Sequence, residues 1–415
     1  MFKRIDNKGE RKAKMKAWQQ LTFKSGLNLK NRLVKAATSE TLGDSSANPT
    51  PQLINLYRKW SEGGIGMIIS GNVMVDRTAR GEVGNVVVDD QTNLNLLKKW
   101  AAAGKSNNSH MLLQLNHPGR QAPKTLNPHP VAPSSVALKG DNAFGFNPPR
   151  ALTLPEIKEI IAAFGRAAQL AEQAGFSGVE IHAAHGYLLN QFLSPAANKR
   201  TDAYGGSLEN RMRIVLQIYD RIRSLTSSSF TVGIKINSSD FTPDGFTVED
   251  SLAVMKALDK RGIDFIEISG GSYEQLKMMG TGKGAMFIKY SKTAKKEVTA
   301  PIIVTGGFRT AEGIEQALAS NATDLVGLAR PIVLNPTLPN DLGNNRFSKV
   351  VVPHFSTGWS QLDKKVGSIV GLAYYEEQMD RLTKGKEIKQ PRTAWPILAY
   401  AFRKQGLGAL MPRRG

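Results

Sequence analysis

The chain has 415 residues and a formal net charge of +20, from 55 Lys and Arg against 35 Asp and Glu. It contains no cysteine, which excludes disulfides, thiolate nucleophiles, iron–sulfur clusters and Cys-ligated zinc. No apolar run approaches the roughly 20 residues of a membrane-spanning helix, and the first residues lack the hydrophobic segment of a signal peptide. The sequence therefore predicts a soluble intracellular enzyme, with the cytoplasm expected and a mitochondrial location left open.

Eight short apolar runs alternate with helical patterns along the chain. Nearly continuous apolar runs are typical of parallel strands that are covered on both faces. The helices between them begin at recognisable capping residues, namely Thr153, Ser207, Thr247 and Thr310. This alternation predicts an α/β fold, a closed (β/α)8 TIM barrel, over residues 19–340. The expected strands are 33–38, 66–70, 111–115, 178–181, 231–236, 264–268, 301–305 and 324–328.

Three segments fall outside this alternation. Residues 117–150 are rich in Pro, Gly, Asn and Ser, and they predict a loop or hairpin inserted after the third strand as a lid. Residues 1–18 form a basic arm, and residues 341–415 form a basic extension with one expected helix, over 364–382. A cluster of like charges is most often a solvated tail, so nucleic acid is not expected as a partner.

The extension also carries an apolar stretch, 395–402, among basic residues. We expect it to dock on the barrel or on a partner subunit of a homo-oligomer. An anionic membrane surface is the less favoured alternative. Pro396 argues against a continuous amphipathic helix there.

Polar residues gather where the fourth predicted strand ends. His182, His185 and Tyr187 follow it, and the active face of a barrel lies at the carboxyl ends of its strands. Two imidazoles and a phenol can polarise a carbonyl group and deliver a proton. A metal pair is less favoured because no carboxylate cluster would complete the ligands, so no metal is predicted. Histidines satisfied within the core are the remaining alternative.

Two further groups of residues are expected at the same end of the barrel, where the strands have their carboxyl ends. Gln114 and Lys235 are polar residues near the ends of apolar strands, and each is either a ligand-binding group or a satisfied core residue. Glycines follow strands seven and eight, where backbone N–H groups and an arginine can bind a phosphate. The residues of this predicted phosphate site are Gly306, Gly307, Ala329 and Arg330.

From Leu21 to Asn340 the chain resembles the old yellow enzymes, which are FMN-dependent NAD(P)H:flavin oxidoreductases or ene-reductases. The most diagnostic block is N-x-R-x-D-x-Y-G-G-S-x-E-N-R, from Asn198 to Arg211. The stretch H-x-x-H-G-Y-L-L-N-Q-F-L from His182, the stretch Q-L-x-H-x-G-R from Gln114 and the first strand also match.

The resemblance implies a hydride transfer from NADH or NADPH to FMN, and then from N5 of FMN to the β-carbon of an activated alkene or to another small-molecule acceptor. His182 and His185 would bind the acceptor's oxygen, and Tyr187 would protonate its α-carbon. Lys235 would stabilise the reduced flavin, and the predicted phosphate site would hold the FMN phosphate. The residues expected beside the isoalloxazine are Ala37, Thr38, Ser39, Gly71 and Gln114.

The chain departs from the commoner family pattern at three of these positions. His185 stands where many members have Asn, Lys235 where many have Arg, and Ser39 where Thr or Cys is frequent. Lysine keeps the charge of arginine and loses its forked geometry. Two other functions remain as alternatives: a barrel metal-dependent hydrolase using His117, His182 and His185, and a non-catalytic scaffold barrel.

Overall fold

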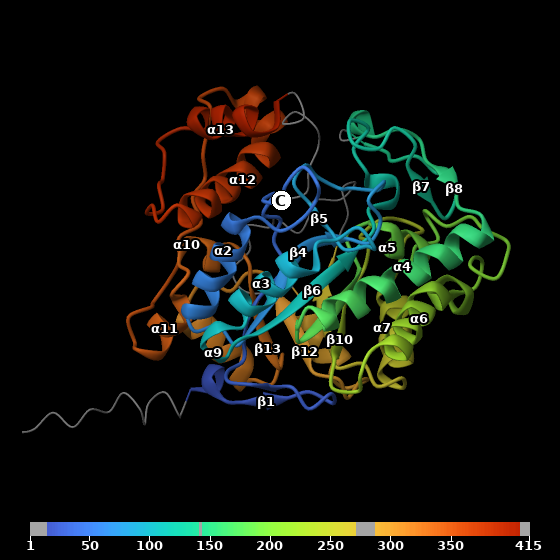
Figure 1. Cartoon of the computed structure of the whole chain (residues 1–415), viewed down its shortest axis with the longest axis horizontal. Helices are drawn as coiled ribbons and strands as arrows, with labels where there is room; N and C mark the ends of the chain where they lie inside the picture. The colour runs from blue at the N-terminus through green and yellow to red at the C-terminus, as the bar shows by residue number, and fades with distance from the viewer. Residues whose placement is uncertain (1–14, 141–142, 271–286, 407–415) are drawn as a thin grey trace, which may run out of the picture.

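The computed structural model describes residues 15–140, 143–270 and 287–406. Most of the basic arm, residues 1–14, therefore lies outside the described residues. Eight parallel strands pair in sequence order, and the last pairs with the first, so the sheet closes into a barrel (Figure 1). All eight predicted strands and the TIM barrel are confirmed. The strands are β3 (Leu33–Lys35), β4 (Met67–Met74), β6 (His110–Asn116), β9 (Gly178–Ala183), β10 (Thr231–Asn237), β11 (Phe265–Ser269), β12 (Ile302–Thr305) and β13 (Leu325–Leu328), and β5 (Val86–Val87) extends β4.

A small apolar core fills the lower half of the barrel. Alternate residues of the strands point inward, and those of β4, β6 and β11 include Ile69, Leu112 and Phe265. A hairpin of β1 (Leu21–Thr22) and β2 (Asn28–Leu29) closes this end, with Phe23 and Leu29 buried against the strand residues. Because one end is plugged, a ligand can enter only at the carboxyl ends of the strands.

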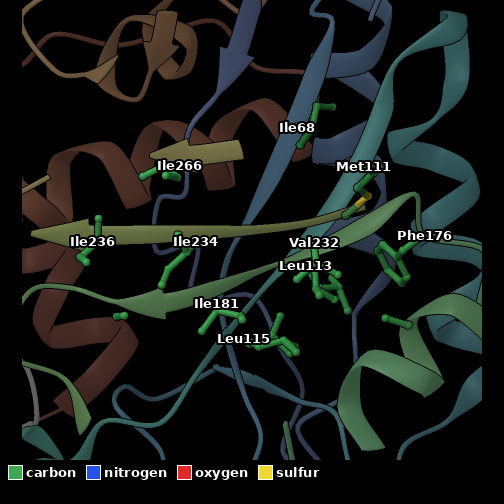
Figure 2. Packing of buried hydrophobic residues seen from close by; sticks show 14 of the residues in the cluster. Ile68, Met111, Leu113, Leu115, Phe176, Ile181, Val232, Ile234, Ile236 and Ile266 are labelled. Atoms are coloured by element: carbon green, nitrogen blue, oxygen red, sulfur yellow. The ribbon is translucent and has the colours of Figure 1, made fainter. Parts of the chain in front are cut away.

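The opposite faces of the strands pack against the surrounding helices. Figure 2 shows this layer, in which residues such as Leu113, Ile181 and Ile234 meet the helical side chains. The four predicted capping residues each accept a hydrogen bond from the backbone three residues later. The helices are α2 (Pro51–Glu62), α3 (Leu94–Gly104), α4 (Leu154–Gln173), α5 (Leu188–Leu193), α6 (Leu208–Leu225), α7 (Val248–Asp259), α8 (Ile288–Ala294), α9 (Ala311–Ala319), α10 (Arg330–Leu334) and α11 (Leu338–Gly343), with short 3-10 turns η1 (Lys16–Trp18), η2 (Ser106–Asn108), η3 (Gly119–Gln121) and η4 (Ala143–Gly145).

The insertion after β6 carries two short strands, β7 (Val131–Ala132) and β8 (Arg150–Ala151). They pair in parallel, with Val131 opposite Arg150 and Ala132 opposite Ala151. The two strands of a hairpin would pair antiparallel. The insertion is therefore a loop whose two short strands run in the same direction, and the hairpin alternative is wrong. It lies over the side of the barrel that carries α5 (Figure 1).

Beyond the end of α11, the described part of the C-terminal extension, to residue 406, contains two helices where one was expected. The predicted helix is α12 (Ser360–Thr383), and α13 (Trp395–Gln405) covers the stretch for which Pro396 argued against a helix. That argument was wrong because Pro396 stands in the first turn, where its missing N–H needs no partner. α13 packs on α12, and α12 packs on α2 and α10 (Figure 1). In the part of the chain that the structure describes, no helix is long and apolar enough to cross a membrane.

Candidate active site

Three aromatic rings lie together at the end of β9. The ring centroids of His182 and His185 are 4.9 Å apart, and those of His182 and Tyr187 are 5.0 Å apart, both pairs edge to face. His182 is 2 % exposed and Tyr187 5 %. The backbone N–H of Ala184 donates to Nδ1 of His182 at 3.3 Å, which assigns the ring proton to Nε2 in the neutral imidazole. The structure therefore brings together the three side chains predicted as catalytic.

A buried polar network shapes the turn that carries His185. His185 has a left-handed backbone, with φ of 67°, which is uncommon for a residue other than glycine. Its N–H donates to Oδ1 of Asn237 at 3.1 Å, and the N–H of Gly186 donates to Oδ1 of Asn190 at 2.6 Å. The amides of Asn237 and Asn190 both donate to Asp240, at 3.0 and 3.1 Å. Side chains from β10 and α5 thus hold the turn in its strained conformation.

The side chain of His185 is held by the next strand of the barrel. Nε2 of His185 and Oγ of Ser269, at the end of β11, share a hydrogen bond of 2.5 Å. Ser269 was not predicted as a site residue, because its sequence neighbours carry only the signal of a buried strand. Its position shows how the barrel joins residues that are distant in sequence.

The insertion borders Tyr187. Phe146 and Leu138 of the insertion pack against the tyrosine ring, in a small cluster separate from the main core. Nε2 of Gln121 donates to the carbonyl oxygen of His185 at 3.0 Å. The loop after β6 therefore forms one wall of the candidate site, consistent with its predicted role as a lid.

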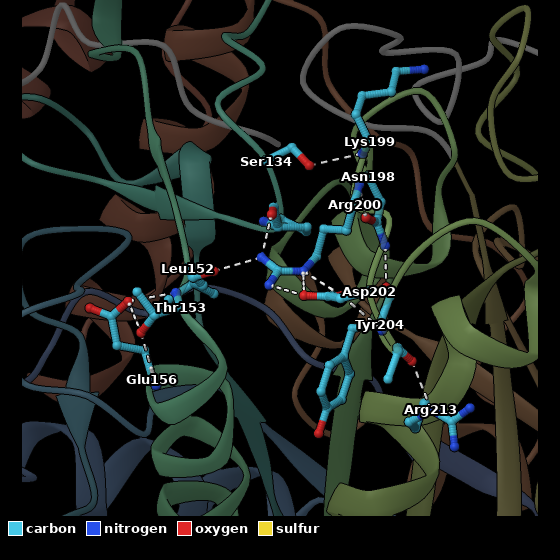
Figure 3. A network of polar contacts seen from close by, with 12 residues as sticks. Ser134, Leu152, Thr153, Glu156, Asn198, Lys199, Arg200, Asp202, Tyr204 and Arg213 are labelled. Carbon is cyan, nitrogen blue, oxygen red and sulfur yellow. Dashed lines mark hydrogen bonds and ion pairs between the residues drawn. The ribbon is translucent and has the colours of Figure 1, made fainter.

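The diagnostic block from Asn198 to Arg211 braces this insertion. Figure 3 shows Arg200 with its guanidinium group on the Asp202 carboxylate. The same group donates to the carbonyl oxygens of Pro133 and Leu152, at 2.9 and 2.6 Å. The block therefore fixes the insertion at Pro133, and the chain directly after it at Leu152, to the barrel.

Four polar side chains line the inside of the barrel below the three rings. Nζ of Lys235 lies 2.9 Å from Oε1 of Glu267, and both side chains are at most 4 % exposed. Nε2 of Gln114 donates to Oε2 of Glu180 at 2.6 Å. Lys235 is registered beside both His182 and Glu267, on the two neighbouring strands. The two glutamates were not predicted, although acidic residues inside otherwise apolar strands were a readable signal.

Desolvation by burial, reinforced by the neighbouring Glu267 carboxylate, raises the pKa of Glu180 well above its ordinary value. Oε1 of Glu180 and both oxygens of Glu267 have no hydrogen-bond donor of suitable geometry among the described residues, apart from the ion-pair contact with Lys235. A proton on Glu180 would supply a donor. The floor of the site thus holds the Lys235–Glu267 ion pair beside a carboxyl group whose pKa is raised.

The residues after β3 lie beside Gly71. A side chain at Gly71 would come within 2.3 Å of the carbonyl oxygen of Thr38, so only glycine fits. The N–H of Gly71 already donates to Glu40 and to Tyr57, at 3.1 and 3.0 Å. The hydroxyl of Thr38 is buried without a hydrogen-bond partner among the described residues, and that of Ser39 donates to Glu82. Ala37 and Thr38 are half-buried at the barrel rim.

The predicted phosphate residues meet at the ends of β12 and β13. Gly306 and Gly307 have φ of 102° and 85°, a left-handed conformation that favours glycine and turns their N–H groups outward from the strand. Arg330 begins α10 directly after Ala329. Arg309, which was not predicted, follows in the same loop as the glycines. Neither arginine has an acidic partner among the described residues, and both are half-buried.

The histidines do not form a metal cluster with acidic residues. Within the described ranges, no group of three or more His, Asp and Glu side chains is placed to hold a metal ion. Nδ1 of His117 accepts the N–H of Gly119 at 3.0 Å, and its Nε2 lies 3.7 Å from Asp76. The structure therefore gives the hydrolase alternative no ligand set that includes His117.

Comparison with known proteins gives the family. Residues 18–348 match the model of the NADH:flavin oxidoreductase / NADH oxidase family. The chain belongs to this family. It is 40 % identical over 356 residues to the NADH-dependent flavin oxidoreductase iliE of Hypocrea jecorina, covering 79 % of this chain and 88 % of the relative. The iliE protein of a Neonectria species is also 40 % identical, over 77 % of this chain, and there the match spans only 46 % of the relative's length.

The solved structures agree with this assignment. Morphinone reductase in complex with tetrahydroNAD superposes with a TM-score of 0.68 at 28 % identity, over 81 % of this chain and 93 % of that chain. The resemblance to the old yellow enzymes and the prediction of a flavin oxidoreductase are confirmed, with FMN as the cofactor and a nicotinamide as the reductant.

The residues of this flavin oxidoreductase fit FMN. Two half-buried arginines without acidic partners stand beside left-handed glycines, a suitable donor set for a phosphate group. The orphaned hydroxyl of Thr38 and the cation of Lys235 are hydrogen-bond donors at the rim and floor of the barrel. The phosphate group of FMN and its ring system would therefore both find hydrogen-bond partners.

Proposed function

We propose that the protein reduces activated alkenes, such as enones, or related small electron acceptors, at the cluster of His182, His185 and Tyr187. The observation that carries this proposal is the contact of the three rings at one strand end. NADH is the expected reductant, because both iliE relatives are named NADH-dependent. FMN, when bound, supplies hydride transfer between the nicotinamide and the acceptor.

The two histidines have the task of binding the acceptor's carbonyl oxygen. Negative charge grows on that oxygen as the alkene takes up hydride, and donors that are already oriented stabilise it best. His182 is oriented by the Ala184 N–H and His185 by Ser269 and Asn237. Both rings are therefore held in place before the acceptor binds.

Tyr187 has the task of delivering a proton to the acceptor's α-carbon. Its ring lies 5.0 Å from that of His182, so both side chains can reach one small molecule. Phe146 and Leu138 cover it from the insertion and limit the access of water. A phenol is a suitable general acid here because it stays protonated at neutral pH and is rigidly held.

The test is to purify the protein, record its visible spectrum and follow two half-reactions without oxygen. NADH or NADPH should bleach a flavin spectrum, and a panel of small enones should restore it. Tyr187→Phe should slow reoxidation by enones about 10²- to 10⁴-fold and leave reduction by the nicotinamide within twofold.

A double change of His182→Ala and His185→Ala should abolish the binding of phenolic ligands, which is visible as the loss of a spectral change on titration. A colourless protein, or a double variant that still binds phenols and reduces enones at the wild-type rate, would refute the proposal. Glu159→Gln, exposed on α4, serves as a control that should leave both half-reactions unchanged.

A further inference from the structure

The C-terminal extension reaches the predicted phosphate site through α12. This helix packs on α10, which begins with Arg330. Tyr375 of α12 is half-buried, and its ring packs against the ring of Tyr374, at a centroid distance of 5.2 Å. Tyr375 and Leu334, at the end of α10, both pack against the same buried cluster. A segment outside the family barrel thus lies against the loops assigned to the FMN phosphate.

The hydroxyl group of Tyr375 is buried and has no hydrogen-bond partner among the described residues. Buried polar groups are normally paired, and an orphan in a native structure is often explained by a ligand. Burial raises the pKa of Tyr375 to about 12, while the nearby charges of Arg330 and Arg309 act to lower it. The phenol therefore stays a neutral donor at pH 7 and lies within the electrostatic reach of both arginines.

Three kinds of hydrogen-bond donor belong to the segments around the predicted phosphate site. They are the two guanidinium groups, the phenol and the N–H groups of the left-handed glycines. Arginine cannot accept a hydrogen bond, so neither guanidinium group can pair with the O–H of the phenol. A dianionic phosphate, with several acceptor oxygens, would satisfy all of them.

We propose that Tyr375 donates a hydrogen bond to the phosphate group of FMN, so that the C-terminal extension is part of the cofactor site. This inference rests on the proposed function, because it needs FMN to bind at these loops. It gives the extension a task beyond packing: it closes the phosphate end of the site with a side chain that the barrel does not provide.

The experiment compares flavins with and without the phosphate. Wild type, Tyr375→Phe and Tyr374→Phe are loaded with FMN or with riboflavin, and Kd is measured from the fluorescence of flavin released on serial dilution. Tyr374 is a matched control, because its hydroxyl is also buried without a partner among the described residues but its ring packs toward α13 and Phe355.

Loss of one hydrogen bond to a charged group should weaken FMN binding by Tyr375→Phe about 10- to 100-fold. Riboflavin binding by that variant should stay within twofold, as should the binding of both flavins by Tyr374→Phe. Unchanged FMN binding by Tyr375→Phe, an equal loss for both flavins, or the same loss in Tyr374→Phe would overturn the inference alone. A wild type that shows no preference for FMN over riboflavin would overturn the inference together with the assigned phosphate site.

Discussion

The protonated carboxyl group proposed for Glu180 predicts a specific dependence of stability on pH. Burial raises its pKa in the folded protein well above 4.5, whereas the same group titrates near 4.5 in the unfolded chain. Between these two values the folded protein holds a proton that the unfolded chain has lost. The free energy of unfolding should therefore fall by about 1.4 kcal/mol for each pH unit in that window. The contribution is fully present below pH 4.5 and is lost as the pH rises through the folded-state pKa.

Glu180→Gln tests this directly, because glutamine has the shape of the protonated carboxyl group. Its oxygen can still accept from Gln114, and its N–H groups can donate toward Glu267. The variant should match wild type near pH 4.5 and become progressively more stable than wild type as the pH rises. The charges that face this position are those of Lys235 and Glu267, from β10 and β11, and they are unchanged in the variant.

The measurement is a set of urea unfolding curves of the purified proteins at half-unit steps from pH 4.5 to pH 8. Glu159→Gln is the control, since Glu159 is exposed on α4 and its replacement should leave the wild-type profile unchanged. Parallel profiles for wild type and Glu180→Gln, or a variant that is less stable at high pH, would show that Glu180 is ionised in the folded protein.

Three further changes test other parts of the structure. Lys235→Met leaves the buried Glu267 carboxylate without its cation and should lower the free energy of unfolding in urea by about 3–5 kcal/mol. Adding Glu267→Gln should restore part of this loss, and additive losses from the two changes would contradict an ion pair between these residues. Arg200→Lys loses the guanidinium group that binds Asp202 and two carbonyl oxygens, so limited proteolysis should cut the insertion faster. An unchanged rate of cutting would show that Arg200 does not hold the insertion in place. Gly307→Ala forces a side chain into a left-handed conformation that costs about 1–2 kcal/mol, so the free energy of unfolding should fall by that amount, and an unchanged urea midpoint would show that the loop relaxes without this cost.

The barrel could be predicted from the sequence because its signals are local. Each strand is a short apolar run, and the longer helices of the barrel carry their own capping residues, as at Thr153 and Ser207. The contact of His182, His185 and Tyr187 could also be predicted locally, because all three lie within six consecutive positions at the end of one strand. Closure of the barrel then needed only the count and order of the strands.

The remaining features depend on contacts between distant segments. Ser269 and Asn237 reach His185 from other strands, and Tyr375, which we propose as a donor to the FMN phosphate, belongs to a separate helix, so no local pattern marks them. The role of Arg200 was hidden for the same reason, because its carbonyl partners belong to the insertion. Proline breaks a helix in its interior but is tolerated in its first turn, and the sequence did not show that the helix begins next to Pro396.

The residues that hold the two histidines are fixed more firmly than those beside Tyr187, and this difference indicates which part of the structure selects the substrate. His182 belongs to a strand that is hydrogen-bonded on both sides, and a buried network fixes the turn of His185. Tyr187 instead borders Phe146 and Leu138, which belong to a loop that Arg200 holds at Pro133 and Leu152. A change of sequence in the middle of that loop can reshape the wall beside the proton donor and leave the oxygen-binding rings in place. We therefore expect the oxygen-binding chemistry to be set by the barrel, and the choice among acceptors to be set by the insertion.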